Sequence, residues 1–133
     1  MVDYDPDLAT KPATYIVSGG ASILGAAIVR QIASAGNNVI IGDTDECAAA
    51  KIADEINGSV AAYRCDVRSD QDLKGIVEFA RETYGGLNGI VNNAVSYLDH
   101  GITSSRADWH EAFDVCVFGG ARLLAEALPM LTQ

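Results

Sequence analysis

The sequence predicts an α/β protein in which one parallel β-sheet carries helices on both faces. Short, β-prone apolar segments alternate strictly with longer segments whose apolar residues recur at the helical period. Glycine, asparagine or a capping serine stands at most of the boundaries between them. The predicted strands are almost continuously apolar, which is typical of strands covered on both faces. With right-handed crossovers, this pattern gives the strand order 3-2-1-4, one half of a doubly wound sheet.

The first strand covers residues 13–17 and runs into Ser18 and two glycines, which end it in a tight turn. The first helix starts at Leu24, because its apolar residues fall at positions 24, 27, 28, 32 and 35, and it closes at Gly36. The second strand, 39–41, is too short and too uniformly apolar for a surface helix. It ends at Gly42 and Asp43.

The second helix has its apolar face at positions 49, 52, 53 and 56 and stops at Asn57, after which residues 59–65 form the third strand. Ser69 and Asp72 have capping-box spacing and open a third helix that Gly85 ends. Residues 87–94 form the fourth strand. Ser105 then opens a last helix that is apolar on nearly all sides and must be covered by something. Its large apolar residues are Trp109, Phe113, Val117, Phe118, Leu123, Leu124 and Leu128.

Length and composition indicate one globular domain. The chain has 133 residues, of which 49% are hydrophobic and 20% charged. Its 18 acidic against 9 basic residues give a net charge of −9, which predicts no nucleic-acid and no membrane partner. Residues 1–12 are acidic and contain proline, so we expect a flexible tail rather than a signal peptide, followed by one domain over residues 13–133.

The cysteines are odd in number and widely spaced. Cys47, Cys65 and Cys116 form no Cys-x-x-Cys pair, and only two histidines are available beside them. We therefore expect no metal site, reduced thiols and a cytoplasmic location.

The glycine-containing turn at residues 18–25 lies between a predicted strand and a predicted helix. In that context backbone N–H groups and the helix N-terminus suit a pyrophosphate, which indicates a dinucleotide site. A strand-to-helix turn without a ligand is the alternative.

Asp43 follows Gly19 by 24 residues and ends the second strand. A carboxylate there can accept hydrogen bonds from both ribose hydroxyls of adenosine. The alternative is a helix cap, because Asp43 and Glu46 have capping-box spacing. Asp43 would repel a 2′-phosphate, and neither Gly42 nor Thr44 offers a cation, so the predicted cofactor is NAD rather than NADP.

Two further polar positions stand beside predicted strands. Asn92 and Asn93 are poor strand formers in an otherwise buried strand, where they serve either a site or a tie between strands. Asp66 and Val67 after the third strand form either a turn or an adenine contact.

In order and spacing, these segments resemble the N-terminal half of the short-chain dehydrogenase/reductases, over the whole chain after the tail. In that family a turn reading Thr-Gly-x-x-x-Gly-x-Gly binds the dinucleotide, the acidic residue after the second strand contacts the adenosine ribose, and an Asp-Val pair contacts adenine. The resemblance implies a Rossmann-type fold and hydride transfer between nicotinamide and an alcohol or ketone. Carried over, the cofactor contacts fall to Ser18, Gly19, Ser22, Ile23, Leu24, Gly25, Asp43, Asp66, Val67, Asn92 and Ala94.

Three residues depart from the family pattern. Ile23 replaces the middle glycine of the turn and puts a β-branched side chain where backbone should approach the cofactor. Val95 replaces a glycine on the nicotinamide side, and Cys116 replaces an asparagine of the catalytic proton relay. Cys116 is interpreted as a small buried hydrophobic residue rather than a reactive thiol.

The resemblance also implies that the catalytic Ser and Tyr-x-x-x-Lys would lie beyond Gln133, so we expect a truncated domain without catalytic residues that is inactive alone. The alternative function is a catalytically inactive nucleotide-binding or oligomerisation module. An open fourth-strand edge and the apolar last helix, which in the family packs against its counterpart, predict a homo-oligomer. The substrate, apart from its class, is not indicated.

Overall fold

The computed structural model describes residues 11–56, 58–98 and 100–131. Most of the predicted tail, residues 1–10, lies outside them. The described chain forms β1 (Thr14–Ser18), α1 (Ile23–Ser34), β2 (Asn38–Asp43), α2 (Glu46–Ile56), β3 (Val60–Arg64), α3 (Asp70–Tyr84), β4 (Gly89–Asn92), the 3-10 turn η1 (Gly101–Thr103), α4 (Arg106–Phe113), the π-helical turn η2 (Asp114–Phe118) and α5 (Gly119–Leu131).

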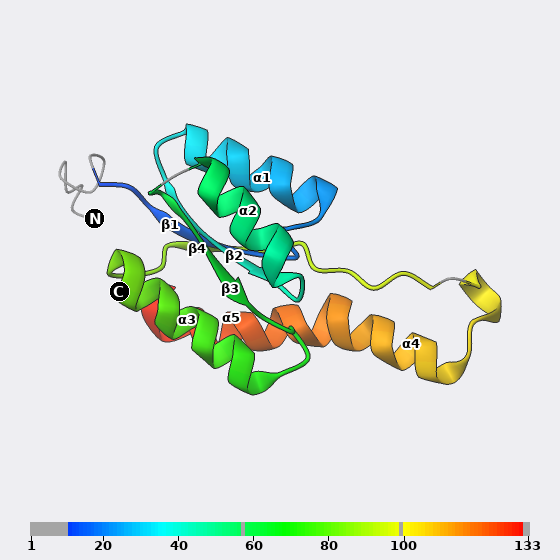
Figure 1. The fold of residues 1–133 in the computed structure, drawn as a ribbon. Coiled ribbons are helices and arrows are strands. Elements are labelled where there is room, and N and C mark those ends of the chain that lie inside the picture. The colour runs from blue at the N-terminus through cyan, green and yellow to red at the C-terminus, as the bar shows by residue number, and fades with distance from the viewer. Residues whose placement is uncertain (1–10, 57, 99, 132–133) are drawn as a thin grey trace, which may run out of the picture.

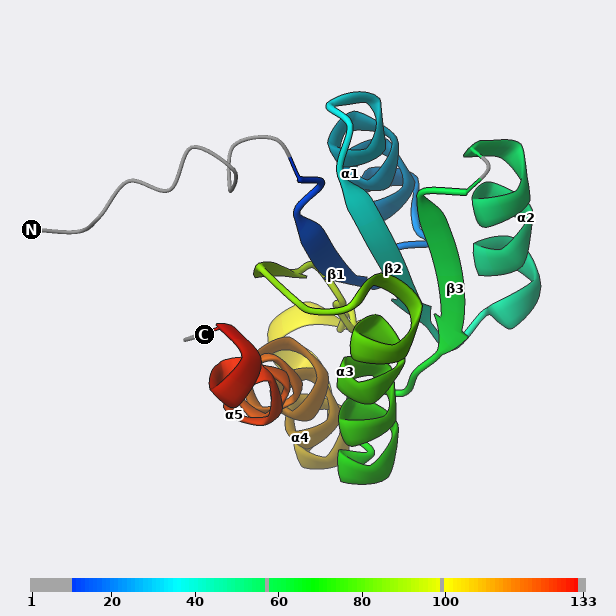
Figure 2. The ribbon, with the colours of Figure 1, turned by 90° about the vertical axis from the view of Figure 1, so that its left-hand side faces the viewer.

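The four strands form one parallel sheet in the order β3-β2-β1-β4, as predicted. Helices α1 and α2 lie on one face of the sheet, and α3 and α5 lie on the other (Figures 1 and 2). The central strand β1 pairs with β2 on one side and with β4 on the other. The predicted fold class and strand order are therefore confirmed.

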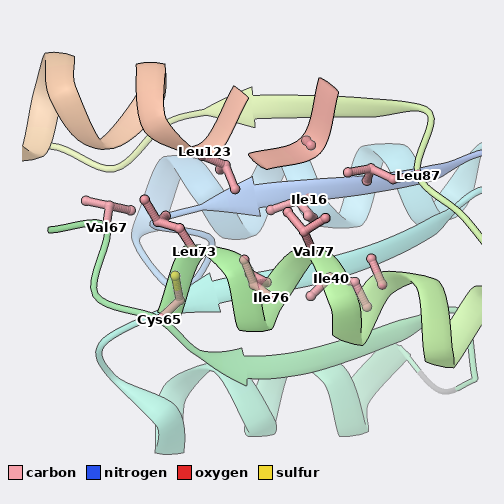
Figure 3. Close-up of a cluster of buried hydrophobic side chains, with 11 residues drawn as sticks. Ile16, Ile40, Cys65, Val67, Leu73, Ile76, Val77, Leu87 and Leu123 are labelled. Atoms are coloured by element: carbon pink, nitrogen blue, oxygen red, sulfur yellow. The ribbon is translucent and has the colours of Figure 1, made fainter. Parts of the chain in front are cut away.

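The core consists of two apolar layers, one on each face of the sheet, because successive side chains of a strand point to opposite faces. Ile16 and Ile40 face the layer beneath α3 and α5, where Leu73, Ile76 and Leu123 pack around them (Figure 3). The layer beneath α1 and α2 is formed by Val17, Val29, Val39, Ile41, Ala49, Ile52, Ala53 and Val60. Packing on both faces of the sheet keeps the carboxyl ends of the four strands in fixed positions relative to one another.

Serines cap the N-termini of three helices, and two of them, Ser69 and Ser105, were predicted to do so. The Ser69 hydroxyl accepts a hydrogen bond from the Asp72 amide at 3.2 Å and caps α3. The Ser105 hydroxyl caps α4 and forms a complete capping box with Asp108. Ser22 caps α1 by accepting from the Gly25 amide at 3.0 Å.

The fourth strand is shorter than the predicted span of residues 87–94. At its start the Asn88 side chain replaces a ladder contact, since its Oδ1 accepts from the Thr14 amide at 2.8 Å. At its end β1 turns away at Gly19, so the Ala94 amide donates to the Ser18 hydroxyl instead of to a strand. The expectation that Asn92 lies inside a buried strand is wrong, because Asn92 ends β4 and is exposed.

The sequence predicted one regular last helix, and this prediction is wrong. The structure has two α-helices, α4 and α5, joined by the wider turn η2. Helix α4 extends past the end of the sheet, whereas α5 packs beside α3 (Figure 1). Leu123 and Ala127 of α5 are buried in the core. Exposed apolar residues follow one another along α4, η2 and α5, and we call them the apolar stripe: Trp109, Phe113, Val117, Phe118, Leu124 and Leu128.

Among the described helices, none is both long and apolar enough to cross a membrane.

Candidate dinucleotide site

A cleft of about 1110 Å³ opens at the carboxyl ends of all four strands. Its walls come from the turn after β1, the segments that follow β2, β3 and β4, and the side chains of Glu111 and Val115. It includes the point between β1 and β4 where the chain connections reverse direction along the sheet. In open parallel α/β sheets this point is the usual place for a ligand.

The turn after β1 uses most of its own backbone donors. The Gly19 and Gly20 amides donate to the Gly42 carbonyl, at 2.7 and 3.4 Å, and the Ser22 amide donates to the Gly19 carbonyl at 3.2 Å. Gly19 has φ +64°, and a Cβ added to it would lie 2.8 Å from Ala94 Cα. Glycine is thus required here both by conformation and by close packing.

The donors left for an anion lie at the start of α1. The Ile23 and Leu24 amides are in the first helical turn and have no partner inside the helix. The Gly25 amide, by contrast, donates to the Ser22 hydroxyl. The helix N-terminus adds partial positive charge. The Ile23 side chain is 96% exposed and lines the cleft beside these donors. An anion that approaches them therefore meets a β-branched side chain.

Asp43 lines the cleft and holds the glycine turn. Its Oδ2 accepts from the Ala21 amide at 2.9 Å, and its Oδ1 accepts from the Asp45 amide at 3.0 Å. The alternative of a helix cap is wrong, because Asp45 caps α2 by accepting from the Ala48 amide at 3.0 Å. Each Asp43 oxygen retains a lone pair, so the carboxylate can still accept from hydroxyl groups.

Asp66 and Arg68 form a bidentate ion pair on the wall that follows β3. The Arg68 guanidinium donates from Nε to Asp66 Oδ1 at 3.0 Å and from a terminal nitrogen to Oδ2 at 2.8 Å. These hydrogen bonds from Arg68 lower the pKa of Asp66 below its ordinary value. Val67 also lines the cleft and is 8% exposed.

Ser18 and Asn93 tie β1 to β4. The Ser18 hydroxyl accepts from the Asn93 and Ala94 amides at 3.1 and 3.2 Å, and Ser18 is 1% exposed. The Asn93 side-chain amide donates to the Ser18 and Gly19 carbonyls at 3.1 and 2.9 Å. The structural interpretation of Asn93 as a tie between strands is therefore confirmed.

The segment after β4 and the turn η2 form the other wall of the cleft. Val95 is 49% exposed and lines the cleft together with Asn92 and Ala94. The Cys116 sulfur lies between the Ser96 amide at 3.5 Å and the Ser96 carbonyl at 3.7 Å. Cys116 is half-buried and joins η2 to this segment.

The cleft gathers nearly all of the predicted contact residues. Gly19, Ser22, Ile23, Leu24, Asp43, Asp66, Val67, Asn92 and Ala94 line it. Ser18 and Gly25 do not line it. The Ser18 hydroxyl already accepts a hydrogen bond from the Ala94 amide between the strands. A Cβ on Gly25 would lie 2.2 Å from the Gly19 carbonyl oxygen, so this position allows only glycine. Both residues therefore support the turn without lining the cleft.

The cleft is also lined by residues that were not predicted from the sequence, among them Arg68, Ser96, Tyr97 and Glu111. Arg68 stands two positions after Asp66, so a charge pair between them was visible in the sequence. Glu111 had no comparable signal, because only the course of α4 brings it to Arg68. In the part of the chain that the structure describes, no group of three His, Cys, Asp or Glu side chains is arranged to hold a metal ion.

A family model described as enoyl-(acyl carrier protein) reductase matches residues 19–133. A solved short-chain dehydrogenase/reductase from Brucella melitensis superposes with a TM-score of 0.85 at 27% identity, over 90% of this chain and 52% of its own. The chain belongs to the short-chain dehydrogenase/reductase family.

Two curated members of this oxidoreductase family are similar in sequence. The 2,5-dichloro-2,5-cyclohexadiene-1,4-diol dehydrogenase of Sphingobium indicum is 36% identical over 66% of this chain and 34% of its own length. The 7alpha-hydroxysteroid dehydrogenase of Escherichia coli is 32% identical over 77% of this chain and 42% of its own length. The chain thus spans between a third and a half of the length of these short-chain dehydrogenase/reductases.

Proposed function

We propose that this chain is the dinucleotide-binding half of an NAD-dependent oxidoreductase that transfers a hydride between nicotinamide and an alcohol or ketone. The observation that carries the proposal is the position of Asp43. Its carboxylate lies in the switch-point cleft, fixed by two backbone amides, in the same cleft as the free donors of the α1 N-terminus. The adenosine end of a dinucleotide needs a hydrogen-bond acceptor for its ribose hydroxyls and hydrogen-bond donors for its phosphates.

The preference for NAD over NADP follows from charge. A 2′-phosphate beside Asp43 would meet a carboxylate, and positions 42 and 44 offer no cation. Arg68 lines the cleft, but its charge is engaged by Asp66 and, at 3.5 Å, by Glu111. The crystal structure of a 3-ketoacyl-(acyl-carrier-protein) reductase from Brucella melitensis, complexed with NADH, has the same fold, with a TM-score of 0.83.

In this proposal the chain binds and orients the cofactor. Asp43 would accept from the ribose hydroxyls, and the Ile23 and Leu24 amides would hold the pyrophosphate. Asp66 and Val67 would contact adenine, and the segment after β4 would contact the nicotinamide side. The bound dinucleotide supplies or takes up the hydride. The Ser and Tyr-x-x-x-Lys of the family match no residues of this chain, so a proton donor has to come from elsewhere in the complete protein, and we expect this chain alone to be inactive.

The test is calorimetric titration of the chain with NAD and NADP. We expect NAD to bind at least about tenfold more tightly than NADP, which corresponds to about 1.4 kcal/mol. Asp43→Asn removes the negative charge and keeps one acceptor, so this preference should fall to about threefold or less. Chemical denaturation of the variant controls for loss of the turn. If NAD does not bind, or if NADP binds equally well, the proposal is wrong.

A catalytically inactive nucleotide-binding or oligomerisation module is the second candidate. Three departures from the family favour it, because Ile23 and Val95 are exposed on the cleft and Cys116 holds the adjoining turn η2. NAD binding by the complete protein without turnover of any alcohol or ketone would support this candidate.

The proposal also includes a homo-oligomer and a cytoplasmic location. The apolar stripe supports an oligomer, since monomeric proteins rarely expose a long contiguous apolar surface. The three unpaired cysteines support a reducing compartment.

A further inference from the structure

Arg68 makes more hydrogen bonds than Arg64, the arginine at the end of β3. Its backbone amide and Nε both donate to Asp66 Oδ1 at 3.0 Å, and a terminal nitrogen donates to Oδ2 at 2.8 Å. Its other terminal nitrogen reaches Glu111 of α4 at 3.5 Å. By contrast, Arg64 at the end of β3 makes one contact of 3.3 Å, to Asp72, and does not line the cleft. Arg68 thus fixes the Asp66 carboxylate from three directions.

The three hydrogen bonds determine what Asp66 has left for a ligand. A carboxylate offers about four lone-pair positions, two on each oxygen. Oδ1 receives two bonds from Arg68 and is filled, whereas Oδ2 receives one. One acceptor position on Oδ2 therefore remains on a side chain that lines the cleft.

A single fixed acceptor distinguishes purine bases. Adenine carries an amino group at position 6, which donates a hydrogen bond, whereas hypoxanthine and guanine carry a carbonyl oxygen there, which a carboxylate repels. The bidentate pair prevents the carboxylate from turning toward another donor on the base, because guanidinium and carboxylate share two parallel bonds. The hydrogen bonds from Arg68 also keep the pKa of Asp66 low, so the acceptor stays charged at neutral pH.

We propose that Arg68 sets the base selectivity of the cleft by holding Asp66 with one free acceptor, which takes the 6-amino group of adenine. This inference rests on the proposed function, since it assigns the adenine end of that site. Arg68 acts through Asp66 and is therefore a positioning residue for the base.

The experiment titrates the full chain with two matched pairs of probes in a calorimeter. The first pair is NAD and nicotinamide hypoxanthine dinucleotide, and the second is AMP and IMP. In each pair only the group at position 6 of the base and the proton at N1 differ. We expect the wild type to prefer the adenine compound by about tenfold to 100-fold, the range for a hydrogen bond to a charged group.

Arg68→Lys keeps the charge but cannot form the two parallel bonds, so the carboxylate can turn and accept from N1–H of hypoxanthine. The preference should then fall to about threefold or less, and Arg68→Gln should lower it similarly. Arg64→Lys is the matched control and should retain the wild-type preference. Thermal unfolding of each variant checks that the fold is retained.

The outcomes separate this inference from the proposed function. If NAD binds and Arg68→Lys keeps the full preference for adenine, Arg68 does not set base selectivity, and the proposed function stands. If AMP is preferred over IMP in an Arg68-dependent way and NAD does not bind, the inference stands and the dinucleotide function falls. If the wild type binds none of the four probes, or binds adenine and hypoxanthine equally, the inference is overturned.

Discussion

At the scale of single residues, Ile23 is the strongest departure from the family in the cleft. Its side chain is 96% exposed beside the two free amides of α1. Nothing in the packing of the described chain holds it there, so its effect falls on a ligand rather than on the core. The family's glycine at this position would leave those amides open.

We predict that Ile23→Gly raises the affinity for NAD by about tenfold, or about 1.4 kcal/mol, because the backbone can then approach the pyrophosphate. Calorimetric titration measures the change. Ile23→Val keeps the β-branched side chain and should bind NAD as the wild type does. An Ile23→Gly variant that binds no more tightly would show that the side chain does not obstruct the cleft.

Cys65 provides a second prediction, which concerns pH. Burial raises the pKa of the Cys65 thiol to about 12, whereas an unfolded cysteine has a pKa of about 8.5. The folded state thus holds this proton more tightly, and its contribution to stability is fully present below about pH 8.5 and is lost as the pH rises toward 12. Urea denaturation between pH 8 and 10 should show a falling midpoint.

Cys65→Ala removes this thiol, so its urea midpoint should fall less steeply over the same pH range than that of the wild type. Part of the slope that remains belongs to Tyr84, whose pKa is also raised by burial. Equal slopes for the two proteins would mean that Cys65 ionises as easily in the folded state as in the unfolded one.

At the scale of elements, the helices differ in how much of the core depends on them. Helix α3 contributes Leu73, Ile76, Val77 and Ala80 to the core, whereas α4 has one buried residue, Ala112. Both helices begin with a capping serine, Ser69 and Ser105. The same substitution can therefore compare a central helix with a peripheral one.

We predict that Ser69→Ala lowers the free energy of unfolding by about 1 kcal/mol, because it leaves an amide of α3 without its cap. Ser105→Ala removes the equivalent cap of α4, but that helix can open without opening the core. It should speed amide hydrogen exchange in α4 and change the global unfolding free energy by less than about 0.5 kcal/mol. Equal global losses would show that α4 unfolds together with the sheet.

The elements also show what the sequence could predict. Periodicity and capping residues identified the strands, the helices and their order, because each depends on local chemistry such as the cap at Ser69. The short extent of β4 was not predictable, since it depends on where β1 turns at Gly19. The turn η2 was missed because a wider turn only shifts the phase of the apolar pattern, and a segment that is apolar on nearly all sides does not reveal such a shift.

At the scale of the cleft, contact residues were predictable where a family motif covers them, as for Asp43 and Asp66. Residues that reach the cleft only through tertiary packing, such as Glu111, were not. Asn93 was ambiguous for a different reason. Its residue type fitted both a site and a tie between strands, and only its hydrogen bonds at 3.1 and 2.9 Å distinguish the two.

At the scale of the whole molecule, we expect the apolar stripe on α4, η2 and α5 to govern whether the chain associates in solution. Phe113, Phe118 and Leu124 are between 50% and 58% exposed. They come from α4, η2 and α5, whose buried residues in the core layer beneath α3 and α5 are Leu123 and Ala127 of α5. The net charge of −9 opposes association, yet burial of the exposed half of such a side chain contributes about 1 kcal/mol.

We predict that the chain self-associates through this stripe and that Phe118→Glu combined with Leu124→Glu yields a monomer, because association would bury the new charges. Sedimentation velocity over a range of concentrations measures the state. Leu24→Glu, at a 65% exposed position of α1, serves as the control and should associate as the wild type does. A monomeric wild type would contradict the prediction.

The strand order has a consequence for the time course of folding. Beside β1, the Ala13 amide contacts Asn37, 24 residues along the chain, whereas the Thr14 amide contacts Asn88, 74 residues along. Contacts of short sequence separation close at lower entropic cost, so β1, β2 and β3 should assemble before β4 docks. The cleft at the β1–β4 junction exists only after that last step. A ligand bound there therefore cannot guide the early events, and its stabilisation should appear as slower unfolding rather than as faster folding.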